Sequence, residues 1–165
     1  MDKNEYSCVL DLPYPCVKGK DNNRLVAELL YKAYLSELYA ISEYIYQEML
    51  FESDYKIAAE TIECIANTEM KHFKMLAKLI LELGYDPKIK FTDGSHKSIK
   101  NLHSQSVNDM FYKKTIYDDI INEKSSAATY RKILGITADK DIKALINRIM
   151  LDEEHHAETL ERLIK

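Results

Sequence analysis

Apolar residues recur at helical spacing in four long stretches of this chain. The pattern predicts helices over about residues 23–51, 54–83, 107–134 and 138–165. Each stretch keeps its apolar side chains on one face, and that face must pack against other helices. The sequence therefore predicts an all-α protein folded as a four-helix bundle.

The segments between the helices predict how the helices connect. Ser53 and Asp54 are expected to cap the second helix, and Gly135 and Thr137 are expected to separate the third from the fourth. Those short connections make each pair of helices antiparallel. Residues 85–105 are rich in turn signals, with a short helix expected near 98–102, and are long enough to cross the bundle from end to end.

The sequence also predicts an N-terminal arm and a single helical domain. Residues 1–20 contain Pro13 and Pro15 and are expected to form an extended N-terminal arm packed on the bundle. Residues 21–165 are expected to form the bundle itself.

Two copies of Glu-x-x-His lie on the inward faces of the second and fourth helices. They are Glu69 with His72 and, 84 residues later, Glu153 with His156. A further Glu precedes each copy on the inward face of the preceding helix, and these are Glu37 and Glu123. Residues three apart share a helix face, so each Glu and His pair is placed to share a metal centre.

Four carboxylates in an apolar core need compensating positive charge. Two divalent cations would supply it, and the mixture of carboxylate and imidazole suits iron or manganese better than structural zinc. Glu69 and Glu153 are expected to bridge the ions, although bridging and terminal roles could be exchanged. The terminal ligands would then be Glu37 and Glu123, with His72 and His156 each binding one ion. The alternative is a hydrogen-bonded polar layer without metal.

Other polar residues lie close to this predicted site. Tyr44 and Tyr130 each follow a predicted ligand Glu by seven residues, and we expect their hydroxyls to hydrogen-bond ligands on neighbouring helices; the alternative is that they are core aromatics. Asp152 is expected on a solvated charged face. Asp119 is expected to be a partly exposed charge near a helix end, and the alternative is that it guides ions toward the site. Tyrosines of the first helix could cover a homodimer interface or solvent-facing grooves; these are Tyr31, Tyr34, Tyr39 and Tyr46.

Composition narrows the function classes. The formal net charge is −4 and no basic stripe with interleaved aromatics occurs, which argues against nucleic-acid binding. No apolar run reaches the ~20 residues that span a bilayer, and no signal peptide is recognisable, so we expect a cytoplasmic protein without membrane contact. Cys8, Cys16 and Cys64 are expected to be free thiols, with a Cys8–Cys16 redox pair as the alternative.

The ligand pattern resembles the ferritin-like diiron or dimanganese carboxylate proteins, nearest to the rubrerythrin and manganese-catalase branch. The resemblance covers roughly residues 23–165 and rests on the six ligand positions, with Asp152-Glu153-Glu154-x-His156 resembling the family's last-helix signature. It implies a left-handed bundle, two iron or two manganese ions, and reactivity with peroxide or dioxygen. The chain lacks the paired Cys-x-x-Cys motifs of a rubredoxin-type domain, and Ser126 stands where rubrerythrins tend to carry an additional Glu. A six-ligand site of this kind is closer to the manganese-catalase and bacterioferritin pattern.

The resemblance leads to one main functional hypothesis and two alternatives. The main hypothesis is an oxidoreductase of oxidative-stress defence, of peroxidase, catalase or ferroxidase type, with an external electron donor if iron is bound. The first alternative is a ferritin-like iron-binding or storage protein. The second is a structural bundle that does no chemistry.

Overall fold

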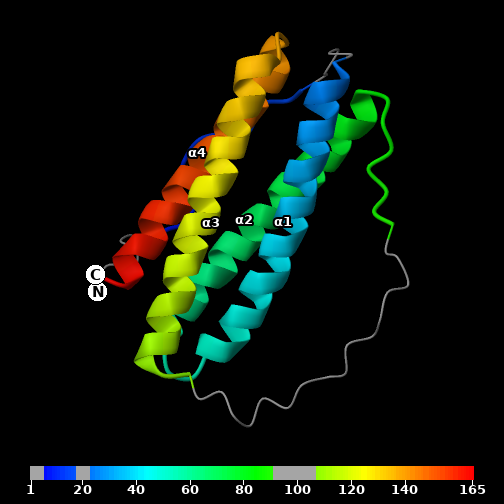
Figure 1. The fold of residues 1–165 in the computed structure, drawn as a ribbon. Helices are drawn as coiled ribbons and strands as arrows, with labels where there is room; N and C mark the ends of the chain where they lie inside the picture. The colour runs from blue at the N-terminus through cyan, green and yellow to red at the C-terminus, as the bar shows by residue number, and fades with distance from the viewer. Residues whose placement is uncertain (1–5, 18–22, 91–106) are drawn as a thin grey trace.

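The computed structural model describes residues 6–17, 23–90 and 107–165, and these form a bundle of four long helices (Figure 1). This confirms the predicted fold class. The expected short helix near 98–102 lies outside the described residues. The helices are α1 (Arg24–Phe51), α2 (Lys56–Glu82), α3 (Asp109–Ile136) and α4 (Lys140–Leu163).

Local sequence signals set most helix ends. The Asn23 side chain accepts a hydrogen bond at the start of α1, and Gly84 adopts a φ of 84° just past α2, where a residue with a Cβ would be strained. Three expected boundaries were wrong. Tyr55, without a side-chain cap, precedes α2 in place of Ser53 or Asp54. The third helix runs through Gly135 to its end, and Asp139 caps α4 in place of Thr137.

The helices form two antiparallel pairs joined by a long crossover. α1 packs along α2, and α3 packs along α4. α2 ends at one end of the bundle and α3 begins at the opposite end (Figure 1), so the connection traverses the length of the bundle. The crossover is confirmed, and it makes α2 and α3 parallel.

The buried apolar side chains form two clusters. The first lies around the start of α1 and the end of α2 and includes Leu30, Leu76, Ile80 and Ile146. Tyr34 belongs to it and stacks on Phe73 at 4.2 Å between ring centroids, so this tyrosine does not cover an outer interface. Residues of the second cluster include Phe51, Ile62, Ile116 and Leu160.

Residues 6–17 run without helix or strand across the α2 and α4 side of the bundle. Arg148 of α4 donates hydrogen bonds to the carbonyls of Leu12 (2.9 Å) and Leu10 (3.3 Å). Cys8 forms a disulfide with Cys64 of α2, so the expectation of free thiols was wrong for this pair; Cys16 is free and exposed. The segment is therefore fixed to both helices.

Among the described residues, no helix is long and apolar enough to cross a membrane.

Candidate metal centre

The six predicted ligands meet in the middle of the bundle, where all four helices contribute. α1 supplies Glu37 and α3 supplies Glu123, while α2 and α4 each supply a Glu and the His one turn later. Every one of the six side chains is at most 3% exposed. Charged side chains are rarely buried this completely unless they are paired, so six ionisable groups together indicate a binding site.

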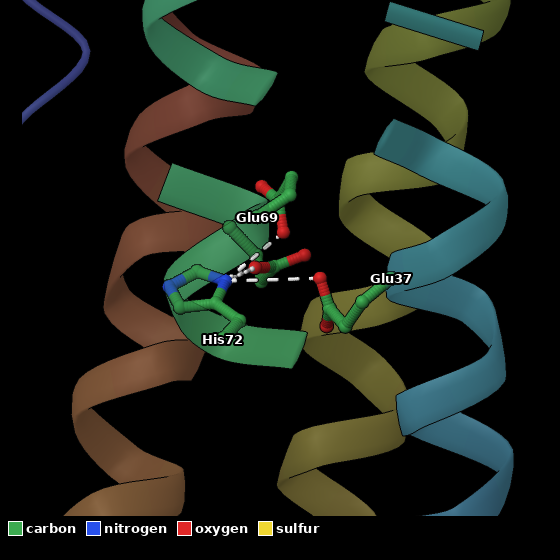
Figure 2. Close-up of side chains that lie close together, drawn as sticks. Glu37, Glu69 and His72 are labelled. Carbon is green, nitrogen blue, oxygen red and sulfur yellow. Dashed lines mark hydrogen bonds and ion pairs between the residues drawn. The ribbon is translucent and has the colours of Figure 1, made fainter. Parts of the chain in front are cut away.

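The six residues form two overlapping groups. Glu37, Glu69, His72 and Glu153 each offer a ligand atom, and these atoms lie within 4.8 Å of one another; Figure 2 shows three of these residues. The second group is Glu69, Glu123, Glu153 and His156, with atoms gathered within the same distance. Glu69 and Glu153 belong to both groups, which is the arrangement of a dinuclear carboxylate and histidine site.

Both imidazoles present Nδ1 to the carboxylates. His72 Nδ1 lies 3.0 Å from Glu69 Oε2 and 3.1 Å from Glu153 Oε1. His156 Nδ1 lies 2.8 Å from Glu69 Oε1 and 3.5 Å from Glu123 Oε2. The shared carboxylate of Glu69 therefore has one oxygen on each side, near a different histidine.

Two tyrosine hydroxyls reach across between the helix pairs. Tyr44 of α1 donates a hydrogen bond to Glu123 of α3, and Tyr130 of α3 donates one to Glu37 of α1. Both tyrosines are buried. The exchange is reciprocal, and it orients each of the two unshared carboxylates from the opposite helix.

Burial and mutual repulsion shift the acidities of the group. Burial raises the pKa of Glu37 and of Glu153 well above the usual carboxyl range, and the Glu69 carboxylate raises both further. For Glu69, burial acts in the same direction, but the charge of His72 and the close approach of Glu37 and His156 hold its pKa well below the usual value. Burial alone would lower the pKa of His72 and His156, but the surrounding carboxylates raise it well above the usual value. Without metal, protons must balance the charge of this cluster.

The donor set fits two divalent cations. Glu69 Oε1, Glu123 Oε2, Glu153 Oε1 and both ring nitrogens of His156 are buried and are not in hydrogen-bond geometry with any described residue. Buried polar atoms without hydrogen bonds are unusual in native proteins, and coordination to a metal would satisfy them. Two divalent ions would also match the charge of four carboxylates.

The sequence reasoning missed a network behind His72. Asp152, expected on a solvated face, is 1% exposed and its Oδ2 lies 3.0 Å from His72 Nε2. Tyr14 donates to the same oxygen (2.6 Å), and Arg148 Nη1 pairs with Asp152 Oδ1 (2.5 Å). The signal was present, because Asp152 lies four residues before His156 on the same helix and Arg148 four before Asp152.

A cavity of about 400 Å³ lies between α1 and α3 and reaches the site. Glu37, Glu123 and Glu153 line its inner part, and Ser36 and Ser126 belong to its wall. On the opposite side, the segment 6–17 covers the gap between α2 and α4. The described residues thus leave the cluster open on one side.

Asp119 also lines this cavity, one turn before Glu123. It is 4% exposed, which corrects the expectation of a partly exposed residue. Gln47 donates to its Oδ1 at 3.0 Å, while Oδ2 has no hydrogen bond among the described residues. Burial raises the pKa of Asp119 to about 7, although the Gln47 hydrogen bond lowers it. It therefore sits in the cavity wall as an additional proton or cation acceptor.

Comparison with known proteins places these features in a family. The family profile described as rubrerythrin matches residues 28–164. Bacterioferritin from Desulfovibrio desulfuricans is 31% identical over 142 residues, which is 83% of this chain and 73% of that protein.

Solved structures give the same result. An X-ray structure of the Desulfovibrio desulfuricans bacterioferritin, described with its diiron site in different catalytic states, has a TM-score of 0.71 and 28% identity over 88% of this chain and 82% of that chain. The Rhodobacter capsulatus bacterioferritin, described with a metal-free dinuclear site and heme iron, has a TM-score of 0.67 and 26% identity over 86% of this chain and 84% of that chain.

Proposed function

The chain belongs to the rubrerythrin family of ferritin-like diiron carboxylate proteins, and we propose that it binds two iron ions and oxidises ferrous iron with dioxygen or peroxide, as an iron-handling protein. The observation that carries the proposal is the pair of ligand groups that share Glu69 and Glu153. Two carboxylates that serve both groups are what a dinuclear site needs.

The similarity to bacterioferritins favours iron over manganese as the metal bound by this chain. The bacterioferritins matched here are described with a diiron site in one case and a dinuclear site in the other. The same relatives support iron binding and ferroxidase chemistry better than the peroxidase or catalase hypothesis drawn first from the sequence. Ser126 also argues against the peroxidase hypothesis, because rubrerythrins tend to carry an additional Glu at this position and Ser126 supplies no carboxylate beside Glu123.

Each residue has a distinct task in this proposal. Glu69 and Glu153 would bridge the ions, Glu37 and Glu123 would each bind one ion, and the two histidines would complete the ligand sets. Tyr44 and Tyr130 would hold the unshared carboxylates in orientation through their hydroxyls. The bound ions supply one-electron chemistry with dioxygen or peroxide.

The cavity between α1 and α3 would admit the reactants. Ferrous iron entering there would find two carboxylates in the cavity wall, Glu123 and Asp119, and Oδ2 of Asp119 has no hydrogen bond among the described residues. Carboxylate oxygens suit this ion. The covered α2 and α4 side would exclude water from behind the histidines.

Metal stoichiometry tests the proposal directly. Protein stripped of metal is titrated anaerobically with Fe²⁺, and two ions per chain are expected. On addition of dioxygen, we expect Fe²⁺ oxidation with repeated turnover as more Fe²⁺ is supplied. Peroxide loss that needs an external reductant would instead indicate a peroxidase, and oxygen evolution by a dimanganese form would indicate a catalase.

Paired variants connect the result to the site. The double change Glu69→Ala and His72→Ala should abolish binding of both ions, because the shared carboxylate is lost. Glu63→Ala on the exposed face of α2 is the matched control and should bind two ions. Retention of two ions by the double variant would refute the site.

A second pair of variants tests the entry path. Ser126→Phe would fill part of the cavity and should slow Fe²⁺ oxidation severalfold while leaving the number of bound ions at equilibrium unchanged. Ala128→Phe lies on the exposed side of the same helix and should leave the rate unaltered. Equal rates in both variants would show that reactants enter elsewhere.

A further inference from the structure

We propose that the two metal positions are unequal: the position at His72 binds its ion first and more tightly, and the position at His156 holds the exchangeable ion. The inference rests on the proposed function, since it takes binding of two ions as its starting point. It concerns the support of the two histidines by this chain's own residues.

His72 is held from behind by a charged network. Its Nδ1 faces the carboxylates of the site, and its Nε2 lies 3.0 Å from Asp152 Oδ2 and 3.3 Å from the Tyr14 hydroxyl. A proton on Nε2 donated to Asp152 leaves the Nδ1 lone pair free for a metal. The carboxylate thus fixes both the tautomer and the ring orientation and makes the imidazole a stronger ligand.

Asp152 is in turn fixed by two partners. Arg148 pairs with its other oxygen at 2.5 Å, and the Tyr14 hydroxyl donates to Oδ2 at 2.6 Å. The Arg148 guanidinium lies 4.5 Å from the Tyr14 ring centroid and also binds the carbonyls of Leu10 and Leu12. The network therefore joins the N-terminal segment, α4 and the ligand on α2 in one rigid unit.

His156 has no such support. Its Nδ1 faces Glu69, but its Nε2 is buried without a hydrogen bond to any described residue. The carboxylates of Glu69 and Glu123 lie on the Nδ1 side of the ring, where the metal would bind, and no carboxylate of a described residue lies within ion-pair distance of Nε2. Metal binding there has no partner behind the imidazole to fix its tautomer.

The residues that precede the two copies of Glu-x-x-His show why the two metal positions differ. Asp152 immediately precedes the ligand Glu153 on α4, and Thr68 immediately precedes the ligand Glu69 on α2. Four residues earlier, Arg148 on α4 corresponds to Cys64 on α2. The charged pair is thus replaced by a neutral one: Thr68 Oγ1 donates to the Cys64 carbonyl at 3.3 Å and lies 3.9 Å from Cys8 Sγ.

Access from solvent does not distinguish the positions, because Glu37 and Glu123 both line the cavity between α1 and α3. What distinguishes the two positions is the hydrogen-bond partner behind the histidine, which His72 has and His156 lacks. Loss of a partner behind a metal-binding histidine typically costs about 10–100-fold in affinity. We therefore expect a first dissociation constant about 10–100-fold lower than the second.

Cobalt(II) is a suitable air-stable probe for this difference. The metal-free full-length protein is titrated with Co²⁺, followed by calorimetry and by visible absorption. Two binding steps are expected. His156→Ala should keep the tight step and lose the weak one, whereas His72→Ala should lose the tight step. The reverse assignment would overturn the inference.

Two further variants test the role of the network. Asp152→Asn keeps a hydrogen-bond acceptor but removes the charge, and should weaken the tight step about tenfold or more with little change in the weak step. A merely structural role would weaken both steps together, and that result would overturn the inference. Thr68→Asp should tighten the weak step, while Thr68→Val, the matched control, should not.

The outcomes separate this inference from the proposed function. Binding of fewer than two Co²⁺ ions by the unchanged protein would refute the dinuclear site itself. Two ions bound with equal affinity would leave the site intact and refute only the inequality.

Discussion

The apolar clusters and the polar layer between them occupy the same four helices but act on stability in opposite directions. The clusters contain side chains such as Ile62 and Ile146, both fully buried, whose removal from water favours folding. The polar layer buries four carboxylates and two imidazoles, at a cost of several kcal/mol for each uncompensated ion. The fold is thus stable around the site and strained at it until metal binds.

The largest expected effect comes from truncating the clusters. Ile146→Ala should lower the free energy of unfolding by about 2–5 kcal/mol, because it removes a fully buried side chain and leaves a cavity. Urea denaturation measures this. The number of metal ions bound should not change. Ile121→Ala, at a position 49% exposed, is the control and should change the free energy by less than about 0.5 kcal/mol.

The covalent link to the N-terminal segment comes next. Reduction of the Cys8–Cys64 disulfide should lower the free energy of unfolding by about 2–4 kcal/mol, since the bond restricts the unfolded chain. Thermal unfolding of the Cys8→Ser and Cys64→Ser double variant would show the same loss without reductant. Cys16→Ser should unfold like the unchanged protein, and an equal loss there would contradict the assignment.

A substitution in the polar layer should raise the free energy of unfolding of the metal-free protein, whereas the changes above lower it. Glu37→Gln removes one buried carboxylate and can still accept the Tyr130 hydrogen bond. The metal-free variant should therefore be more stable than the metal-free parent, by about 1–4 kcal/mol. Its metal-loaded form should lose affinity. Destabilisation of the metal-free form would show that the layer is already compensated by other means.

The smallest expected effect is that of pH, and it separates the metal-free and loaded forms. Glu37 and Glu153 have pKa values raised above the unfolded value of about 4.3, so the stability from their protonated forms is complete below that pH and is lost as pH rises through the folded pKa. The raised pKa of His72 acts in the same direction above about pH 6.5. Glu69, whose pKa is lowered, contributes stability that is complete above about pH 4.3 and is lost only as pH falls below that value, so it leaves the trend at higher pH unchanged.

Between about pH 5 and pH 8, the metal-free protein should therefore become less stable as pH rises. Metal binding requires deprotonated ligands, so the loaded protein should show the reverse trend. The difference between the melting temperatures of the metal-loaded and metal-free forms is expected to increase as pH rises. A gap that is independent of pH would mean that metal displaces no protons from the cluster.

The helical pattern of the sequence was sufficient to predict the bundle, and the spacing of Glu69, His72, Glu153 and His156 predicted that these four side chains lie together, as they do. That success has a physical cause, since both depend on periodicity along single helices. The missed features depend on contacts between distant segments. Asp152 looked like a surface charge because its partners Tyr14 and Arg148 include a residue of the N-terminal segment, and no periodicity links that segment to α4. The Cys8–Cys64 bond was missed for the same reason, with 56 residues between its ends.

The shared ligands also have a consequence for assembly. Each metal position draws on both helix pairs, because Glu69 comes from the first pair and Glu153 from the second. The two pairs, made as separate polypeptides divided between residues 90 and 107, would each hold three ligands of one position and one ligand of the other. Bound metal would then act as the cross-link between fragments, and fragment complementation in this protein would depend on the metal supplied.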